Sequence, residues 1–146
     1  MHVRRSIRAA VATALASLAT TGANVFVGRT YVLQDADLPA LRIYTDAETA
    51  AIGSLGVRRA LERELEVAVE ACFKDLASLD DLGDTILEEV ETALGAPGVD
   101  LGGAKLVNLS RVELVRDAEG EEPRAVLRMT FTAVYVTAHG APGQAL

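Results

Sequence analysis

The stretch that decides the fold is Ala125-Val-Leu-Arg-Met-Thr-Phe-Thr-Ala-Val-Tyr-Val136, near the end of a chain of 146 residues. Its residues alternate between a wholly apolar set and a set rich in β-branched side chains. A period of two places successive side chains on opposite faces of a strand. The second set, which includes Arg128, suits a half-covered face. The predicted buried face consists of Ala125, Leu127, Met129, Phe131, Ala133 and Tyr135.

The run before this stretch, Val107 to Arg116, is also strand-like. Its alternation slips near Val115, where we expect a bulge. Asp117-Ala-Glu-Gly-Glu-Glu-Pro123 lies between the two runs, and its Gly and Pro are typical of a turn. The sequence from Val107 to Thr137 therefore predicts a long β-hairpin with one apolar face.

Composition limits the class of protein. Half of the residues are hydrophobic, so a chain of this length can bury a core without disulfides. Cys72 is the single cysteine, which excludes an internal disulfide and fits a reducing compartment. The net charge is −7, which disfavours duplex binding as a main role because few cations are available to neutralise phosphates. No stretch reaches the ~20 apolar residues of a membrane span, and we expect no membrane partner.

The first 19 residues allow two interpretations. Three arginines precede an alanine-rich run that ends at Ala19, as in a secretory signal. The same run has apolar residues at helical spacing, so we favour a folded amphipathic helix from Val3 to Ala19, with Gly22 as its C-terminal cap. Its apolar stripe would be Ile7, Val11, Leu15 and Leu18.

Further elements follow from local patterns. Leu61 to Phe73 has apolar residues at both spacings, but its unbroken alternation with glutamates favours a strand over a helix. A second helix begins after Ser78 or Asp80 and ends at Gly95. Shorter strands are expected at Asn24 to Val27, Tyr31 to Leu33 and Ala40 to Tyr44, with a turn at Asp35 to Pro39.

Two segments show no period. Thr45 to Arg59 contains two glycines and is either a solvated loop or a partner-binding loop that becomes ordered on assembly. Ala138 to Leu146 is rich in Gly, Ala and Pro and is expected to fray.

The order of elements predicts an α/β protein of the two-layer α+β type. It would have a mixed, mostly antiparallel sheet, two helices packed on one face and a long C-terminal β-hairpin. We expect a single domain over residues 1–137 and a flexible tail over residues 138–146. The face with Arg128, Thr130, Thr132 and Val134 would remain open to water or to another subunit.

Motifs for catalysis are weak. Gly98-Val-Asp-Leu-Gly-Gly-Ala-Lys105 superficially matches a phosphate loop, but Ala104 stands where the lysine is required. Cys72 has no histidine near it in the sequence, so a structural thiol is favoured over a nucleophile. An acidic cluster could gather a divalent cation, although a solvated helix face is the favoured interpretation; its members are Asp80, Asp81, Asp84, Glu88, Glu89 and Glu91, of which Asp84 and Glu88 share a helix side. We expect no catalytic residue, no metal site and no cofactor.

Several segments together resemble the lambda-type phage tail terminator proteins, the minor tail protein U family. These segments are Ile7-Arg-Ala-Ala-Val-Ala-Thr-Ala-Leu15, Thr21-Gly-Ala-Asn-Val-Phe-Val-Gly-Arg29, Asp35-Ala-Asp-Leu-Pro-Ala-Leu-Arg-Ile-Tyr44, Ala60 to Val69, Leu79 to Leu94 and the turn at Asp117 to Gly120. The chain departs from the family in a longer segment, Gly95 to Gly103, and in its extension after Thr137.

The resemblance implies a structural protein and no reaction. Copies would form a homo-oligomer, a hexameric ring on the head-proximal end of the phage tail. The ring would stop growth of the tail tube protein and present the surface for the head–tail connector protein, and DNA would pass through its lumen without specific binding. The protein would lie in the host cytoplasm during assembly and in the virion tail afterwards, whether the source is an active phage or a prophage.

Candidate interface residues follow from these expectations. Arg58 and Arg59 would contact the tube or a neighbouring subunit, and the acidic turn with Glu119, Glu121 and Glu122 would lie at a rim of the ring. On the strand face that the helices leave open, the candidates are Arg42 and Arg128.

Two other functions remain open on the sequence. The first is a neck or head-completion subunit of similar build. The second is a small cytosolic ligand-binding or regulatory domain whose long loop covers a pocket. An enzyme is the weaker class.

Overall fold

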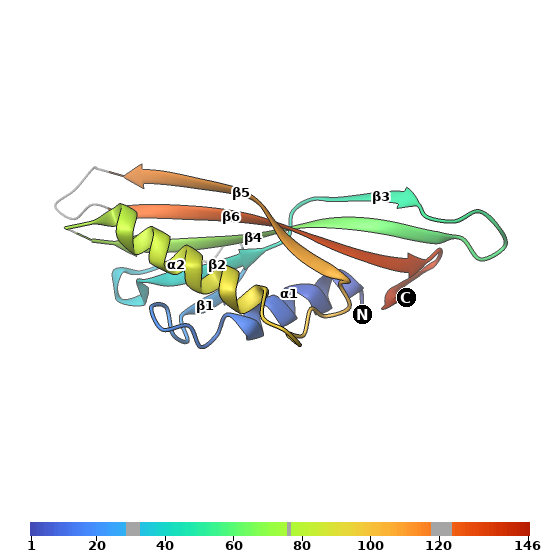
Figure 1. Ribbon diagram of the computed structural model, residues 1–146, viewed down its shortest axis with the longest axis horizontal. Coiled ribbons are helices and arrows are strands. Elements are labelled where there is room, and N and C mark those ends of the chain that lie inside the picture. Colours follow the sequence, from blue (N-terminus) through green and yellow to red (C-terminus); the bar gives the residue numbers. More distant parts are fainter. Residues whose placement is uncertain (29–32, 76, 118–123) are drawn as a thin grey trace.

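The computed structural model describes residues 1–28, 33–75, 77–117 and 124–146. Figure 1 shows two helices beside an elongated sheet. The elements in chain order are α1 (Val3–Ala14), β1 (Val25–Val27), a 3-10 helix η1 (Asp35–Asp37), β2 (Ala40–Tyr44), β3 (Glu48–Ile52), β4 (Ala60–Lys74), α2 (Leu79–Leu94), β5 (Leu106–Asp117), β6 (Arg124–Ala138) and β7 (Ala141–Ala145).

Two long antiparallel strands, β4 and β6, form the centre of the sheet. They pair over their full length, from Ala60 opposite Ala138 to Lys74 opposite Arg124. The outer edge of β4 is shared by β2 and β3, which follow one another along it. The outer edge of β6 is shared by β5 and β7 in the same way. β1 extends the sheet beyond β2 and is parallel to it.

Both helices cover one face of this sheet, as the sequence predicts. The alternation of β6 is confirmed, because every residue of the predicted apolar face from Ala125 to Tyr135 is buried and each residue between them is half-buried. Gly83 of α2 allows close packing, since a Cβ there would lie 3.2 Å from the ring of Phe73. The largest fully buried side chains of this core are Ile7, Val11, Leu15, Leu41, Ile43, Leu65, Phe73, Ile86, Met129 and Tyr135.

The fold class is confirmed as α+β, with a mixed, mostly antiparallel sheet and a C-terminal hairpin formed by β5 and β6. The strand predictions for Asn24 to Val27, Ala40 to Tyr44 and Leu61 to Phe73 are confirmed by β1, β2 and β4. The predicted second helix is confirmed by α2, which ends with Gly95 as its cap.

The first helix is shorter than predicted. It ends at Ala14 with Leu15 as its cap, not near Ala19. The chain then turns so that Leu18 packs against the core and pairs with Gly22, whose N–H donates to the Leu18 carbonyl at 2.8 Å. Gly22 thus serves this turn and does not cap the helix.

The prediction of a continuous loop from Thr45 to Arg59 is wrong over five residues. Glu48–Ile52 form β3, which pairs with Leu61 to Leu65 of β4. Four of its five side chains are exposed, so no apolar period reveals the strand in the sequence. Backbone pairing with β4 is what forms it.

The C-terminal residues also differ from the prediction. Ala141–Ala145, expected to fray, form β7 against the end of β6. The bulge expected near Val115 lies instead between Leu109 and Arg111, where the Ser110 hydroxyl donates to the Thr130 carbonyl at 2.8 Å.

Two predicted features fall on residues outside the described ranges. The strand expected at Tyr31 to Leu33 is described only at Leu33, which is not in a strand. The turn expected between β5 and β6 is described only at Asp117, the last residue of β5.

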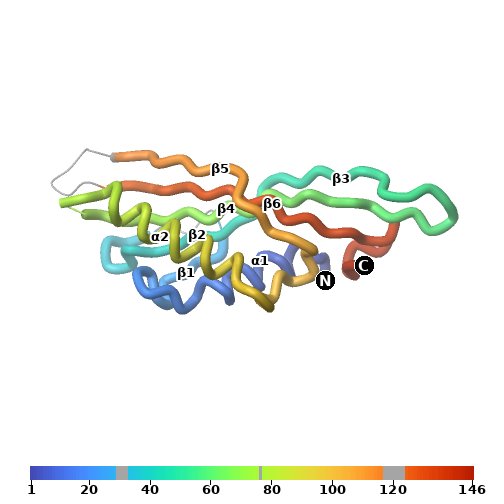
Figure 2. Tube along the Cα trace, viewed as in Figure 1, coloured from blue at the N-terminus to red at the C-terminus, as the bar shows by residue number. Residues whose placement is uncertain are grey.

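The sheet continues past the helices at one end of the molecule. We call this projection the arm; it consists of β3, residues 53–59 and the parts of β4 and β6 paired beside them (Figure 2). Both strands of its β3–β4 hairpin extend away from the helices, toward the end of the molecule opposite the start of α2.

Candidate functional site

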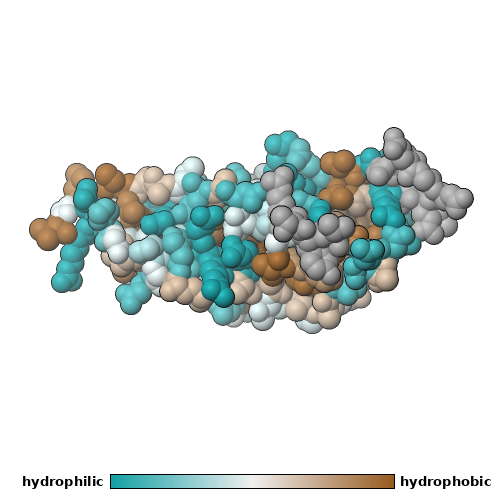
Figure 3. Space-filling view, turned by 180° about the vertical axis from the view of Figure 1, so that it is seen from behind, coloured by the Kyte–Doolittle hydropathy of each residue, from teal (hydrophilic) through white to brown (hydrophobic). Residues whose placement is uncertain are grey.

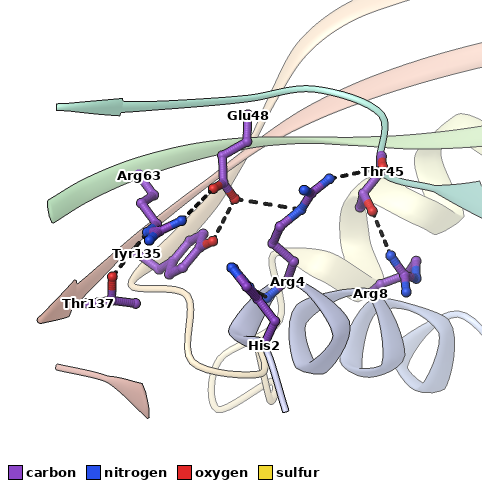
Figure 4. Close-up of polar contacts among 8 residues, drawn as sticks. All are labelled: His2, Arg4, Arg8, Thr45, Glu48, Arg63, Tyr135 and Thr137. Carbon is purple, nitrogen blue, oxygen red and sulfur yellow. Dashed lines mark hydrogen bonds and ion pairs between the residues drawn. The ribbon is translucent and has the colours of Figure 1, made fainter. Parts of the chain in front are cut away.

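A buried polar network fixes the base of the arm (Figure 4). Glu48 of β3 accepts hydrogen bonds from Arg63 Nη1 at 2.9 Å and from the Tyr135 hydroxyl at 2.5 Å. Arg63 Nε also donates to Thr137 Oγ1 at 3.0 Å. Tyr135 and Thr137 are fully buried. One carboxylate therefore links three neighbouring strands, and charge-assisted bonds of this kind are the strong ones.

The first helix is tied to the same region. Arg4 Nε lies 3.8 Å from the Glu48 carboxylate, and Arg4 Nη2 donates to the Thr45 carbonyl at 3.3 Å. Arg8 Nη1 donates to the Thr45 hydroxyl at 2.7 Å. These contacts connect α1 with the junction of β2 and β3, so the arm cannot turn freely relative to the helices (Figure 4).

The chemistry of this network is structural. Burial, and then the hydrogen bond to Glu48, raise the pKa of Tyr135, so the phenol remains a neutral donor. The Arg63 guanidinium lies 5.9 Å from the centre of the Tyr135 ring, a cation–π distance. A neutral phenol between an arginine and a carboxylate holds the neighbouring strands in place and does not act as a nucleophile.

The helix-free face of the sheet carries a second charged cluster, formed by Arg42, Tyr44, Glu70 and Arg128. Glu70 is only 8% exposed, and it accepts hydrogen bonds from Arg42 Nη2 at 2.6 Å and from the Tyr44 hydroxyl. The Arg128 guanidinium lies 5.5 Å from the centre of the Tyr44 ring. The two arginines predicted as interface residues are thus brought together on one face, where they are only partly exposed.

Cys72 lies beside this cluster and is buried. Burial raises the pKa of its thiol, which makes the thiolate scarce. The structure therefore agrees with a structural thiol.

The tip of the arm presents apolar side chains to solvent. Leu55 is 87% exposed, Val57 is fully exposed and Ile52 is 58% exposed. Arg58 and Arg59, the other predicted interface residues, are exposed directly beside them. The two strands of the hairpin are closed by a hydrogen bond from the Gly53 N–H to the Ala60 carbonyl at 2.9 Å and from the Ala60 N–H to Ser54 Oγ at 3.1 Å. The tip is thus a hydrogen-bonded hairpin end that combines apolar and cationic side chains. Figure 3 shows hydrophobic residues at this end of the molecule.

The remaining predicted interface residues are not placed. Glu119, Glu121 and Glu122 fall outside the described residues, so their position at a ring rim stays a prediction.

A groove of about 350 Å³ lies between α1 and the loop after α2. This volume is near the lower limit of small-molecule sites. Its one carboxylate, Asp100, already accepts a hydrogen bond from the Gly102 N–H at 2.8 Å. The groove offers few free polar groups to orient a ligand; its lining is Ser6, Ala9, Ala10, Thr13, Ala14, Val99, Asp100 and Gly102.

Within the described ranges, no three His, Cys, Asp or Glu side chains are grouped so that they could hold a metal ion. The acidic residues of α2 all come from this one helix, and no His, Cys, Asp or Glu of another described element joins them in such a group. No helix in the part of the chain that the structure describes is both long and apolar enough to cross a membrane.

The Glu48 network was not predicted from the sequence. Its signal was Arg63, which replaces an apolar residue in the alternation that places Leu61 and Leu65 on the core face. A cation at such a position requires a buried partner. Glu48 lay in a segment without a period, so the partner could not be named.

Comparison with solved structures gives a distant likeness. No family model matches the chain, and no curated protein matches it. The chain is similar to a chain of the solved structure described as "Virion of native gene transfer agent (GTA) particle", with 18% identity and a TM-score of 0.42. The match covers 91% of this chain and 92% of the other. A likeness this distant supplies no argument about function, which rests on the surfaces described above.

Proposed function

We propose that this chain is a structural subunit of a phage-like particle. Within that class, we propose that it is a tail terminator. Copies would close into a ring, with six as the expected number, on the finished tail tube at the head-proximal end. The ring would stop tube growth and provide the surface for head attachment, with no reaction and no cofactor.

The observation that carries the class is the exposed apolar end of the arm. Ile52, Leu55 and Val57 lie at the tip of a projecting hairpin whose base is fixed by a partly buried ion pair. Contiguous exposed apolar side chains of this kind mark a contact with another protein. The fixed base means that the tip is held in place before the contact forms, which lowers the cost of binding.

The particular function is supported by the resemblance to tail terminators, which runs through α1, β2, β4 and α2. The elongated shape of the subunit also supports the tail-terminator function. The arm lies at one end of an elongated subunit, and a contact between different ends of identical copies is heterologous and can close into a ring.

The charge of the molecule suits a passage for DNA. The net charge is −7. Glu62, Glu64 and Glu66 alternate along β4 and are exposed on its helix-free face. A row of carboxylates repels phosphates, so a lumen bordered by it would let DNA pass without binding.

The test uses the tail tube protein that the proposal requires, taken from the genome that encodes this chain. Purified tube protein is allowed to polymerise with and without the full chain, and tube lengths are measured by electron microscopy. We expect shorter tubes with a ring at one end that carries a label on this protein. Tubes of unchanged length and without a ring would refute the proposal.

The same preparations test the two rivals. Label on the head portal instead of the tail end would indicate a neck subunit. A strict monomer at all concentrations in sedimentation would indicate the small ligand-binding domain.

A further inference from the structure

The two ends of the subunit have opposite charge. Residues 50–61, which form the arm tip, contain Arg58 and Arg59 and no acidic residue. The start of α2 lies at the opposite end of the molecule (Figure 1). Side chains are exposed both at the tip and on the outer side of this helix. The tip is therefore a local cationic site on a chain that is otherwise strongly acidic.

The far end combines carboxylates with an exposed valine. We call it the α2–β5 surface; it consists of Asp80, Asp84 and Glu88 of α2 with Val112 of β5, which lies opposite Met129 on the helix side of the sheet. All four side chains are exposed. The acids are spaced by four, so they share one side of the helix. An ion pair between Arg116 and Asp80 shows that this side lies beside β5. Within the described residues, β5 pairs only with β6, so its outer edge is free.

We propose that the arm tip of one copy docks on the α2–β5 surface of a second copy. The inference rests on the proposed function, because it names the contact by which the ring would close. Arg58 and Arg59 would face the acids of α2, and Leu55 and Val57 would cover Val112 at the edge of β5.

Charge and geometry both indicate that a second copy of the chain binds to the α2–β5 surface. The tip is cationic and apolar, and the surface is anionic and apolar, so each supplies what the other lacks. The two lie at opposite ends of one rigid subunit, so a copy cannot satisfy itself. Each copy would use one tip and one surface, and such head-to-tail contacts form a closed ring when the rotation from one copy to the next closes.

The experiment exchanges the charges. The first variant, Arg58→Glu with Arg59→Glu, reverses the tip; the second, Asp84→Arg with Glu88→Arg, reverses the surface. All four side chains are exposed, so circular dichroism and thermal unfolding should match the wild type. A control, Arg5→Glu with Lys105→Glu, changes the net charge as the first variant does, at exposed sites on neither surface.

Each full-length protein is examined by sedimentation velocity and native mass spectrometry over a range of concentrations. We expect the wild type and the control to assemble. Each reversal alone should raise the dissociation constant at low salt by about tenfold or more, because like charges then face each other.

Mixing the two reversed variants gives the decisive result. Every contact between unlike variants again joins opposite charges, so the mixture should assemble with alternating subunits while each variant alone remains dissociated. Failure of the mixture to assemble, or normal assembly of either variant alone, would overturn the proposal.

The outcomes separate this inference from the proposed function. If the wild type forms rings and caps tubes but the variants still form rings, the docking site is wrong and the terminator proposal stands. If the tip variant forms rings that no longer cap tubes, the tip binds the tube protein and this proposal is overturned. If the wild type is monomeric at all concentrations, both fail.

Discussion

Replacing Glu48 by Gln should lower the free energy of unfolding by about 2 to 3 kcal/mol, the amount typical of a lost hydrogen bond to a charged group plus the penalty of an unsatisfied partner. Glu48 accepts from Arg63 Nη1 and from the Tyr135 hydroxyl. The side chains of Glu48 and Arg63 are only 11% and 15% exposed. An exposed ion pair would contribute about 1 kcal/mol or less to stability. We expect a larger loss here because both side chains are largely shielded from water. Gln keeps the volume and one acceptor oxygen but leaves the guanidinium without its counter-charge.

The assay is urea unfolding followed by circular dichroism, at concentrations where the wild type is monomeric. Glu62→Gln is the control. Glu62 precedes Arg63 in β4 and is exposed, so this variant removes one negative charge but should change the free energy of unfolding by less than about 0.5 kcal/mol. The double variant Glu48→Gln with Arg63→Met should cost less than the sum of the two single changes, because the two side chains act as a pair.

Hydrogen exchange shows where the loss falls. Amides of β3 should exchange faster in Glu48→Gln, while those of α2 should exchange nearly as in the wild type, because the network lies at the base of the arm. If Glu48→Gln behaves like Glu62→Gln in both measurements, the network does not hold the arm, and the argument for a prepositioned tip is lost.

Three further predictions follow from single features. Because the pKa of Tyr135 is raised from 10.0, the unfolded chain loses the phenol proton first, so the stability of the wild type relative to Tyr135→Phe should fall as pH rises above about 10 in urea unfolding. Gly102→Ala should cost about 3 kcal/mol in the same assay, because φ is +64° and a Cβ would lie 2.4 Å from the Ser6 carbonyl; Gly98→Ala, with φ +77° and open space, should cost about 1 to 2 kcal/mol. Arg58→Glu with Arg59→Glu should leave the subunit folded and give overlong or uncapped tails in electron micrographs, and normal tails would contradict the assigned role.

The parts of the fold that the sequence predicts are those with one buried face. In β6, α2 and the first half of β4, burial of one side imposes a period that can be read from residue types alone. β3 and β7 have almost no buried side chains, and they form because the long central strands leave free edges. A strand held by backbone pairing alone leaves no hydrophobic period in the sequence.

The candidate site divides in the same way. Arg58 and Arg59 could be singled out because they are cations in a segment with no apolar period. The Glu48–Arg63 pair could not, because it depends on the register of β3 against β4. A shift of that register by one residue would move Glu48 to the other face of the sheet, away from Arg63.

The arm follows from a mismatch of lengths. β4 and β6 are 15 residues long and span about 50 Å, at roughly 3.3 Å per residue. The two helices have 12 and 16 residues and span only about 18 and 24 Å, at 1.5 Å per residue. The helices overlap in part, so they cannot cover the whole sheet, and some of it must meet either water or another molecule. Along β4 the exposed positions are glutamates, which suit water, whereas at the tip they are Leu55 and Val57, which do not. The change from charged to apolar residues along one exposed hairpin is therefore the reason to propose the tip as the place where a partner binds.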